Sequence, residues 1–212
     1  LDDNQESFEP SLEELRIPSN VEYIGRAAFN GIRKIENDSP YFKIDKDALL
    51  SNDGTNLIYY FGKSKKYRIP SGVVTVWSNA FMGNQYIEEI TIPSSVRTIE
   101  SNAFEDCSQL RSVVFNSDYL FLGDSAFFEC KKLSSFKMPK RMGNLSGRTF
   151  WGCQSLTEIN IPEGVEIIGN ASFWYCYSLK KIVLPSSIKT IEDDAFNHCD
   201  YLSELHLPEG LK

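Results

Sequence analysis

The 212-residue chain is poor in basic residues and in long apolar stretches, and each shortage excludes a class of protein. Acidic residues outnumber lysine and arginine by 29 to 22, which gives a net charge of −7. Nucleic acids and anionic membrane surfaces attract clustered positive charge, so the sequence predicts no nucleic-acid partner. No run of about 18 apolar residues is present, so no transmembrane segment is expected in this chain.

Catalytic and metal-binding patterns are also missing. The only two histidines, His198 and His206, lie in no GxSxG, HExxH or P-loop pattern, and we interpret both as surface residues. The aspartates Asp45, Asp47 and Asp53 are too few and too loosely ordered for a calcium loop. The sequence therefore predicts no enzyme, no catalytic residue, no metal site and no cofactor.

The composition permits one domain. With 42% hydrophobic residues, the chain can bury a substantial core without splitting. Residues 1–10 are too polar to offset the entropy of ordering, so we expect a flexible N-terminal segment followed by a single domain over 11–212. The chain begins without a methionine or a signal peptide, which suggests a processed precursor or a trimmed chain.

A period of 23 residues runs through the sequence. Phenylalanine recurs at this interval six times, and every cysteine follows one of these phenylalanines by three residues. We expect the two columns to form a structural ladder that consists of Phe81, Phe104, Phe127, Phe150, Phe173, Phe196, Cys107, Cys130, Cys153, Cys176 and Cys199. Such a period is typical of solenoids, in which stacked repeats bury a core that no single repeat could bury.

Each repeat predicts a strand, a turn, an extended return and a short helical turn. Alternating apolar residues such as Ile159 and Ile161 indicate a strand, and Pro162 ends it because proline has no N–H to donate. Phe104 and Cys107 are spaced like one face of a short helix or 3₁₀ turn. The sequence therefore predicts about nine rungs with a parallel β-sheet.

The repeat is irregular near residues 41–60. The Ile-Pro pair at 17–18 is followed by the next one, at 69–70, after 52 residues, six more than two periods. Asn52-Asp53-Gly54 lies there between two apolar runs, which is a hairpin signal. We expect a β-hairpin insertion that lengthens or decorates one rung.

The unit that starts at Ile92 reads IPSSV and continues through Ile99, Phe104, Cys107 and Leu110. It resembles the BspA-like leucine-rich repeats, whose pattern is IPSSVxxIGxxAFxxCxxLxxI, and the resemblance covers nearly the whole chain. It implies a right-handed β/α solenoid that is secreted or lies on a bacterial cell surface. Some members bind host matrix proteins, so the resemblance implies a recognition or adhesion role, without a binding motif that transfers to single residues.

The cysteine column raises the question of disulfides. Stacked repeats about 4.8 Å apart would bring successive cysteines within disulfide range. Parallel side chains in register keep the Cβ atoms apart, however, and five cysteines leave one over. No CxxC pair offers convergent zinc ligands. We expect buried free thiols.

Large aromatic residues gather beside the phenylalanine column. If exposed, they would form a candidate binding ridge of Phe128, Trp151, Trp174, Tyr175, Tyr177 and Tyr201. The alternative is that packing half-buries them and that their stacking stabilises the solenoid.

The outward residues of the strands form the second candidate surface. They are Arg16, Arg68, Thr91, Val114, Lys137, Asn160, Val183 and His206. Repeat proteins usually bind with this face. The neighbouring column is mixed in charge, so a merely solvated face is the alternative.

The leading functional hypothesis is a recognition or adhesion module that binds a host or matrix protein through an exposed repeat face. A structural spacer and a carbohydrate-binding repeat region that uses Trp151 and Trp174 are the alternatives. The last rung stops just after a strand, at Leu207-Pro208, and an exposed edge invites pairing. Truncation and end-to-end self-association therefore both stay open.

The column assignment can be tested on Phe150, which lies in the middle of the ladder. Phe150→Ala is expected to lower the free energy of unfolding by about 3–5 kcal/mol, because the missing ring leaves a cavity. Thermal or denaturant unfolding measures the loss. An unchanged unfolding curve would contradict the assignment.

Overall fold

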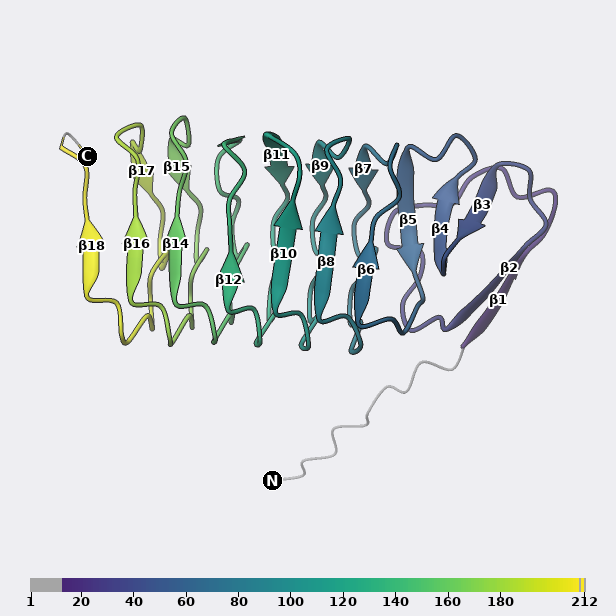
Figure 1. Ribbon diagram of the computed structural model, residues 1–212, viewed down its shortest axis with the longest axis horizontal. Helices are drawn as coiled ribbons and strands as arrows, with labels where there is room; N and C mark the ends of the chain where they lie inside the picture. Colours follow the sequence, from purple (N-terminus) through teal and green to yellow (C-terminus); the bar gives the residue numbers. More distant parts are fainter. Residues whose placement is uncertain (1–12, 210, 212) are drawn as a thin grey trace, which may run out of the picture.

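A computed structural model describes residues 13–209 and 211 and shows a solenoid of about eight turns. Figure 1 shows the rungs side by side along the long axis, with β1 to β5 at one end and β18 at the other. The expected repeat solenoid is confirmed. The segment 1–10, expected to be flexible, lies outside the described residues.

The first strand of each regular rung belongs to what we call the front sheet. Its strands are β6 (Lys66–Arg68), β8 (Glu89–Ile92), β10 (Ser112–Phe115), β12 (Ser135–Phe136), β14 (Glu158–Asn160), β16 (Lys181–Val183) and β18 (Glu204–His206). Paired neighbours run parallel with partners 23 residues apart, as in Lys66 and Glu89. The sequence period is therefore the strand register.

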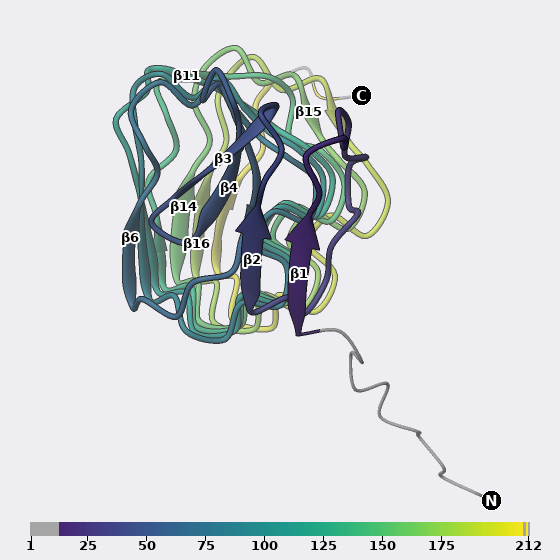
Figure 2. The same cartoon turned by 90° about the vertical axis from the view of Figure 1, so that its right-hand side faces the viewer.

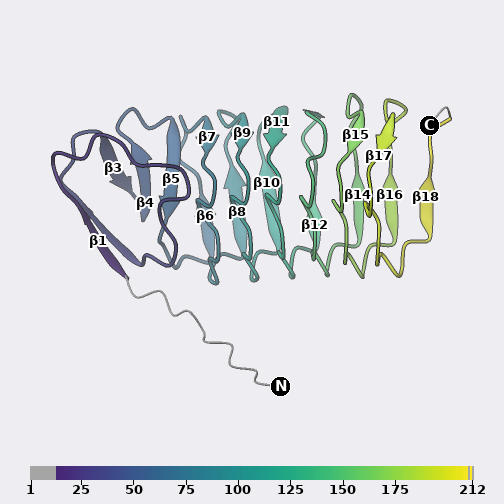
Figure 3. The same ribbon diagram turned by 180° about the vertical axis from the view of Figure 1, so that it is seen from behind.

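The extended return of each rung forms a second parallel sheet, the rear sheet, which Figure 3 shows from behind. Its strands are β7 (Thr75–Val76), β9 (Thr98–Ile99), β11 (Tyr119–Leu122), β13 (Arg141–Met142), β15 (Ile167–Ile168) and β17 (Thr190–Ile191). Seen end-on in Figure 2, successive rungs lie over one another, so equivalent residues form columns.

The third side of each rung contains turns, and the prediction of a short helix or 3₁₀ turn there is wrong, since the described residues contain no helix. The N–H of Glu105 donates to the carbonyl of Asn102, three residues back, at 3.1 Å. The next N–H, that of Asp106, instead donates at 2.8 Å to Phe128 in the following rung. A helix would use both groups internally. Here every second N–H joins two rungs, and we call this third set of bonds the turn ladder.

The core is a stack of phenylalanine rings. The five rings from Phe81 to Phe173 are fully buried, and Phe196 is partly buried. Successive centroids are 4.7 to 5.8 Å apart and the ring planes lie within 17° of parallel. One ring per rung thus fills the same space in every layer.

All five cysteines are free, and four of them are buried. Each thiol donates to the carbonyl of the phenylalanine 26 residues earlier, at 3.1 to 3.3 Å, as Cys107 does to Phe81. The thiols therefore bond to the backbone of the preceding rung, while the parallel register keeps them from pairing with each other.

The N-terminal end departs from the repeat. β1 (Glu14–Ile17) and β2 (Lys34–Asn37) form a separate parallel pair whose partners are 20 residues apart. β3 (Phe42–Asp45), β4 (Ala48–Ser51) and β5 (Asn56–Tyr60) follow as an antiparallel meander. β5 then pairs in parallel with β7, which connects the meander to the rear sheet.

The expected hairpin at Asn52-Asp53-Gly54 is the turn between β4 and β5. A second hairpin, between β3 and β4, was not predicted. Its turn residues Lys46 and Asp47 have φ angles of 47° and 63°, as a two-residue type I′ turn requires. The pair lacks the Asn-Gly or Asp-Gly signal of such turns, so the sequence gave no sign of it.

Both sheets are interrupted at the same level. β12 pairs with β10 and β14 pairs with β16, but β12 and β14 do not pair. Only the isolated bridge between Leu145 and Ile168 crosses the rear sheet there. The turn ladder continues, because the N–H of Phe127 donates to Thr149 at 2.9 Å.

A single larger side chain accounts for this interruption. Phe136 occupies the inward strand position where the neighbouring rungs have Val113 and Ile159. Its ring inserts edge-on between Phe127 and Phe150, at centroid distances of 5.0 and 4.7 Å and interplanar angles of 71° and 75°. The extra volume holds the two strands apart, since a packed core does not absorb it otherwise.

The thiols provide a test of the packed core. Burial raises the pKa of Cys199 to about 12 and also raises the pKa values of the four fully buried thiols. Because the thiolate is the reactive form, we expect slow reaction of the native protein with a disulfide reagent at pH 8. Cys199 should react first and the other four only as the chain unfolds. Cys199→Ser should remove the first phase, and equal rates for all five thiols would contradict the buried column.

Candidate interaction surfaces

The turn segments of consecutive rungs bring five of the six predicted ridge residues into ring contact. Trp151 and Trp174 stack with centroids 4.6 Å apart and 27° between planes, and Phe128 lies 5.5 Å from Trp151. Tyr175 lies 5.6 Å from both Trp174 and Tyr177. Tyr201 lies outside this chain of ring contacts.

The ridge is only partly exposed. Phe128, Trp151, Trp174 and Tyr175 are half-buried, whereas Tyr177 and Tyr201 are 37% and 68% exposed. Because the large rings face each other along the solenoid axis, neighbouring rings cover their faces and their edges are left for solvent. The ridge therefore has both the stacking role and the accessible surface that the sequence left as alternatives.

The backbone of the ridge is strained at Tyr175. This residue has a φ of 61°, in the left-handed region that favours glycine, asparagine and aspartate. Gly83 and Gly152, at the same repeat position, have φ 71°. The indole N–H of Trp174 is buried without a hydrogen-bond partner among the described residues, which adds a further cost.

Sequence reasoning missed two members of the ridge. The ring of His198 stacks on Tyr175 at 4.9 Å, and the guanidinium of Arg148 lies 5.6 Å over the ring of Trp151. The signal for His198 was its place 23 residues after Tyr175. Arg148 lies three residues before Trp151, in a turn whose shape the sequence did not reveal.

Acidic residues lie one rung before the ridge. Glu105 and Asp106 occupy the repeat positions that Phe128 and Glu129 hold in the next rung. Burial raises the pKa of Glu105, and the adjacent Asp106 raises it further. Glu129 is paired with Lys131 at 3.0 Å. The ridge thus has a carboxylate-rich flank on one side and His198 on the other.

The strand face is divided more than the sequence suggested. Arg16 lies on β1, outside the front sheet, and its guanidinium pairs with Asp38 at 2.6 Å, so it does not continue the column. The other seven residues follow the front sheet, and Val114 and Val183 are 50% and 43% exposed. The interruption between β12 and β14 separates Lys137 from Asn160.

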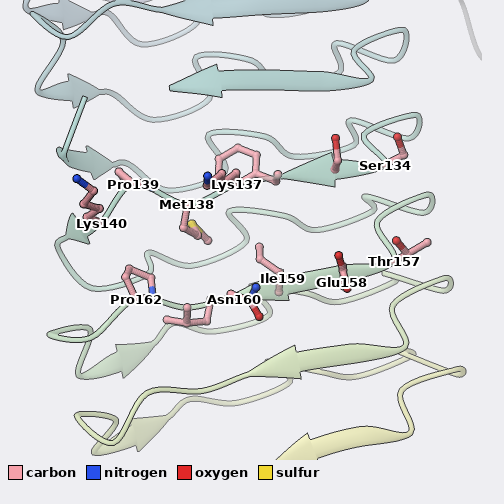
Figure 4. A pocket seen from close by; sticks show the side chains of 13 residues that line it. Ser134, Lys137, Met138, Pro139, Lys140, Thr157, Glu158, Ile159, Asn160 and Pro162 are labelled. Atoms are coloured by element: carbon pink, nitrogen blue, oxygen red, sulfur yellow. The ribbon is translucent and has the colours of Figure 1, made fainter. Parts of the chain in front are cut away.

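A groove of about 550 Å³ lies at this interruption, and Figure 4 shows its lining from close by. Two chain segments, 134–140 and 157–162, form its walls. Met138, Ile159 and Ile161 contribute apolar surface, and Lys137 and Glu158 lie on opposite sides. The sequence gave no sign of the groove, because the period is unbroken there.

Metal and membrane features were also sought in the described part of the chain. Within it, no group of three or more histidine, cysteine or acidic residues converges as metal ligands would. Residues 13–209 and 211 contain no helix of a length and hydrophobicity that would cross a membrane.

The chain matches the family model of the BspA type leucine rich repeat region, in six copies. The matched segments are 4–134, 51–180 and 121–212. A comparison with curated proteins found no significant match.

Several solved structures have the same fold. A leucine-rich repeat protein of T. pallidum is 30% identical with a TM-score of 0.71, and the match covers 80% of this chain and 81% of that one. A leucine rich cell surface protein of Faecalibacterium prausnitzii A2-165 is 29% identical with a TM-score of 0.66. That match covers 76% of this chain and 47% of the relative, so the chain spans about half the relative's length.

A leucine-rich repeat protein of Eubacterium ventriosum has a TM-score of 0.65 at 24% identity, over 95% of this chain and 62% of its own. The family match runs over nearly all of the chain, and the rungs repeat in parallel register every 23 residues. This chain belongs to the BspA-type leucine-rich repeat family.

Proposed function

We propose that this chain is a non-catalytic recognition module that binds another protein through the aromatic ridge. The observation that carries the proposal is Tyr175, a bulky residue held at φ 61° in the middle of the ridge. Two rungs have glycine at this position, so the fold itself does not require a ring there. Backbone strain of this kind costs about 1–3 kcal/mol and is typical of functional sites. A binding role gives the ring a purpose.

The ring arrangement favours a protein over a glycan as the ligand. A sugar would stack on an open ring face, but the faces of Trp151 and Trp174 are turned toward each other at 4.6 Å. Ring edges carry the positive part of the aromatic quadrupole and attract the oxygen atoms of carbonyls and carboxylates. Tryptophan, tyrosine and arginine are also the residues that dominate binding at protein interfaces, and Arg148 lies over Trp151.

The relatives support a place outside the cell. The Faecalibacterium prausnitzii relative is described as a cell surface protein. We therefore propose that this chain acts in an extracellular or surface-bound protein, with residues 11–212 as one domain and with a host or matrix protein as the partner class.

A structural spacer is the second candidate, and the unbroken phenylalanine stack favours it. Two sheets and the turn ladder join consecutive rungs, and ion pairs such as Lys66 with Glu89 at 2.8 Å add contacts along the front sheet. A rod of this kind would separate other domains without a ligand of its own. Binding measurements distinguish the two roles.

The ridge is tested by removing its rings without disturbing the fold. Tyr175→Gly replaces the strained residue with the one that Gly152 already represents, so relief of strain should offset the lost ring contacts and leave Tm within a few degrees. Binding to an immobilised panel of host extracellular-matrix proteins is measured for the wild type and for the variant. We expect the wild type to bind at least one panel member and the variant to bind it at least about tenfold more weakly.

Tyr86→Ala is the matched control, because Tyr86 is 44% exposed and occupies the repeat position of Tyr201 outside the ridge. It should leave the affinity unchanged. A panel that stays blank, or equal losses in both variants, would argue against recognition by the ridge and favour the spacer.

A further inference from the structure

The groove between β12 and β14 has an open backbone edge at its wall. In other rungs the N–H before the front strand donates to the preceding rung, as Glu88 does to Lys65 at 2.7 Å and Lys180 to Thr157 at 2.9 Å. The equivalent bond from Thr157 to Ser134 is not formed. Among the described residues, no backbone hydrogen bond joins 134–140 to 157–162. Strand edges with free N–H and C=O groups act as templates for another strand.

The gap is fixed by the packing around it. Phe136 separates the two strands from the core side, and the turn ladder holds the rungs together on the far side. At the rear sheet, the side-chain carbonyl of Asn144 accepts the N–H groups of Glu166 and Ile167 at 3.0 and 3.2 Å. In regular rungs a backbone carbonyl does this, so a side chain keeps the attachment while the front stays open.

The groove also contains charges that the solenoid leaves unused. Elsewhere on the front sheet, Lys66 pairs with Glu89 and Lys181 with Glu204. Lys137 and Glu158, on opposite sides of the groove, take part in no ion pair within the described chain. A ligand with polar groups of both signs along an extended backbone would satisfy them.

We propose that this groove accepts one extended peptide segment of a partner protein, which pairs its backbone with the open edge of β14. Alternate apolar side chains of the peptide would contact Met138, Ile159 and Ile161, because side chains of a strand point to opposite faces with a period of two. Its outward polar side chains would meet Lys137 and Glu158. Strand addition of this kind gains affinity from main-chain bonds and selectivity from the pocket. A volume of about 550 Å³ is within the range of ligand sites. The proposal does not depend on the aromatic ridge.

The experiment selects ligands from a displayed library of random linear dodecapeptides against the whole chain. We expect enriched peptides with alternating apolar residues. N-methylation at every second backbone nitrogen of a selected peptide should weaken binding by at least about tenfold in one phase of the alternation and leave it unchanged in the other. Failure to enrich peptides, or binding insensitive to N-methylation in either phase, would overturn the proposal.

Phe136→Ile is the matched protein variant, because it restores an aliphatic residue of the kind found in the neighbouring rungs and should let β12 and β14 pair. Hydrogen exchange should then slow at the Thr157 amide, and the selected peptides should lose binding. Tyr175→Gly should leave peptide binding intact, which separates this site from the ridge. Undiminished binding to a Phe136→Ile protein that shows the slowed exchange would overturn the proposal, whatever the ridge does. If that variant does not fold, the N-methylated peptides on the wild type decide.

Discussion

Backbone pairing between residues 23 positions apart is the constraint on which the rest of this structure depends. It acts in three places in each rung, through the front sheet, the rear sheet and the turn ladder. Because the register is fixed, every side chain lies above its equivalent in the preceding rung. Phenylalanine rings then stack within 17° of parallel, and thiols reach the carbonyl of the rung below. Core composition and surface columns both follow from this one spacing.

The same constraint makes local departures visible. Phe136 is one residue larger than its column allows, and the two sheets separate where it lies while the turn ladder persists. The rungs on either side remain regular, because each rung of a solenoid contacts only its neighbours. A substitution that would disturb an entire globular core therefore creates a local groove here. Repeat architecture lets a binding surface form at one level without a change in the others.

Surface and stability are in tension on the turn side. The turn ladder needs two residues per rung in the left-handed region, and asparagine, aspartate or glycine meet this need in several rungs, as Asn102, Asp106 and Gly152 do. Tyr175 and Arg148 do not belong to that group, yet they hold the same backbone shape beside the two tryptophans. The rungs with the largest rings are thus also rungs with unfavourable backbone residues. This coincidence distinguishes the ridge from ordinary half-buried packing.

The 23-residue period by itself determined the solenoid, the strand register, the phenylalanine and cysteine columns and the hairpin at Asn52-Asp53-Gly54, because each is a local or strictly periodic property. The tertiary structure alone decided the rest. Phe and Cys three residues apart fit a helix equally well, and only the neighbouring rung, which takes every second N–H, selects turns. Ridge membership of His198 and Arg148, the loss of Arg16 from the front sheet and the groove at Phe136 depend on contacts between rungs. A periodic sequence specifies which residues stack, but the space between them is set by side-chain volume and backbone strain.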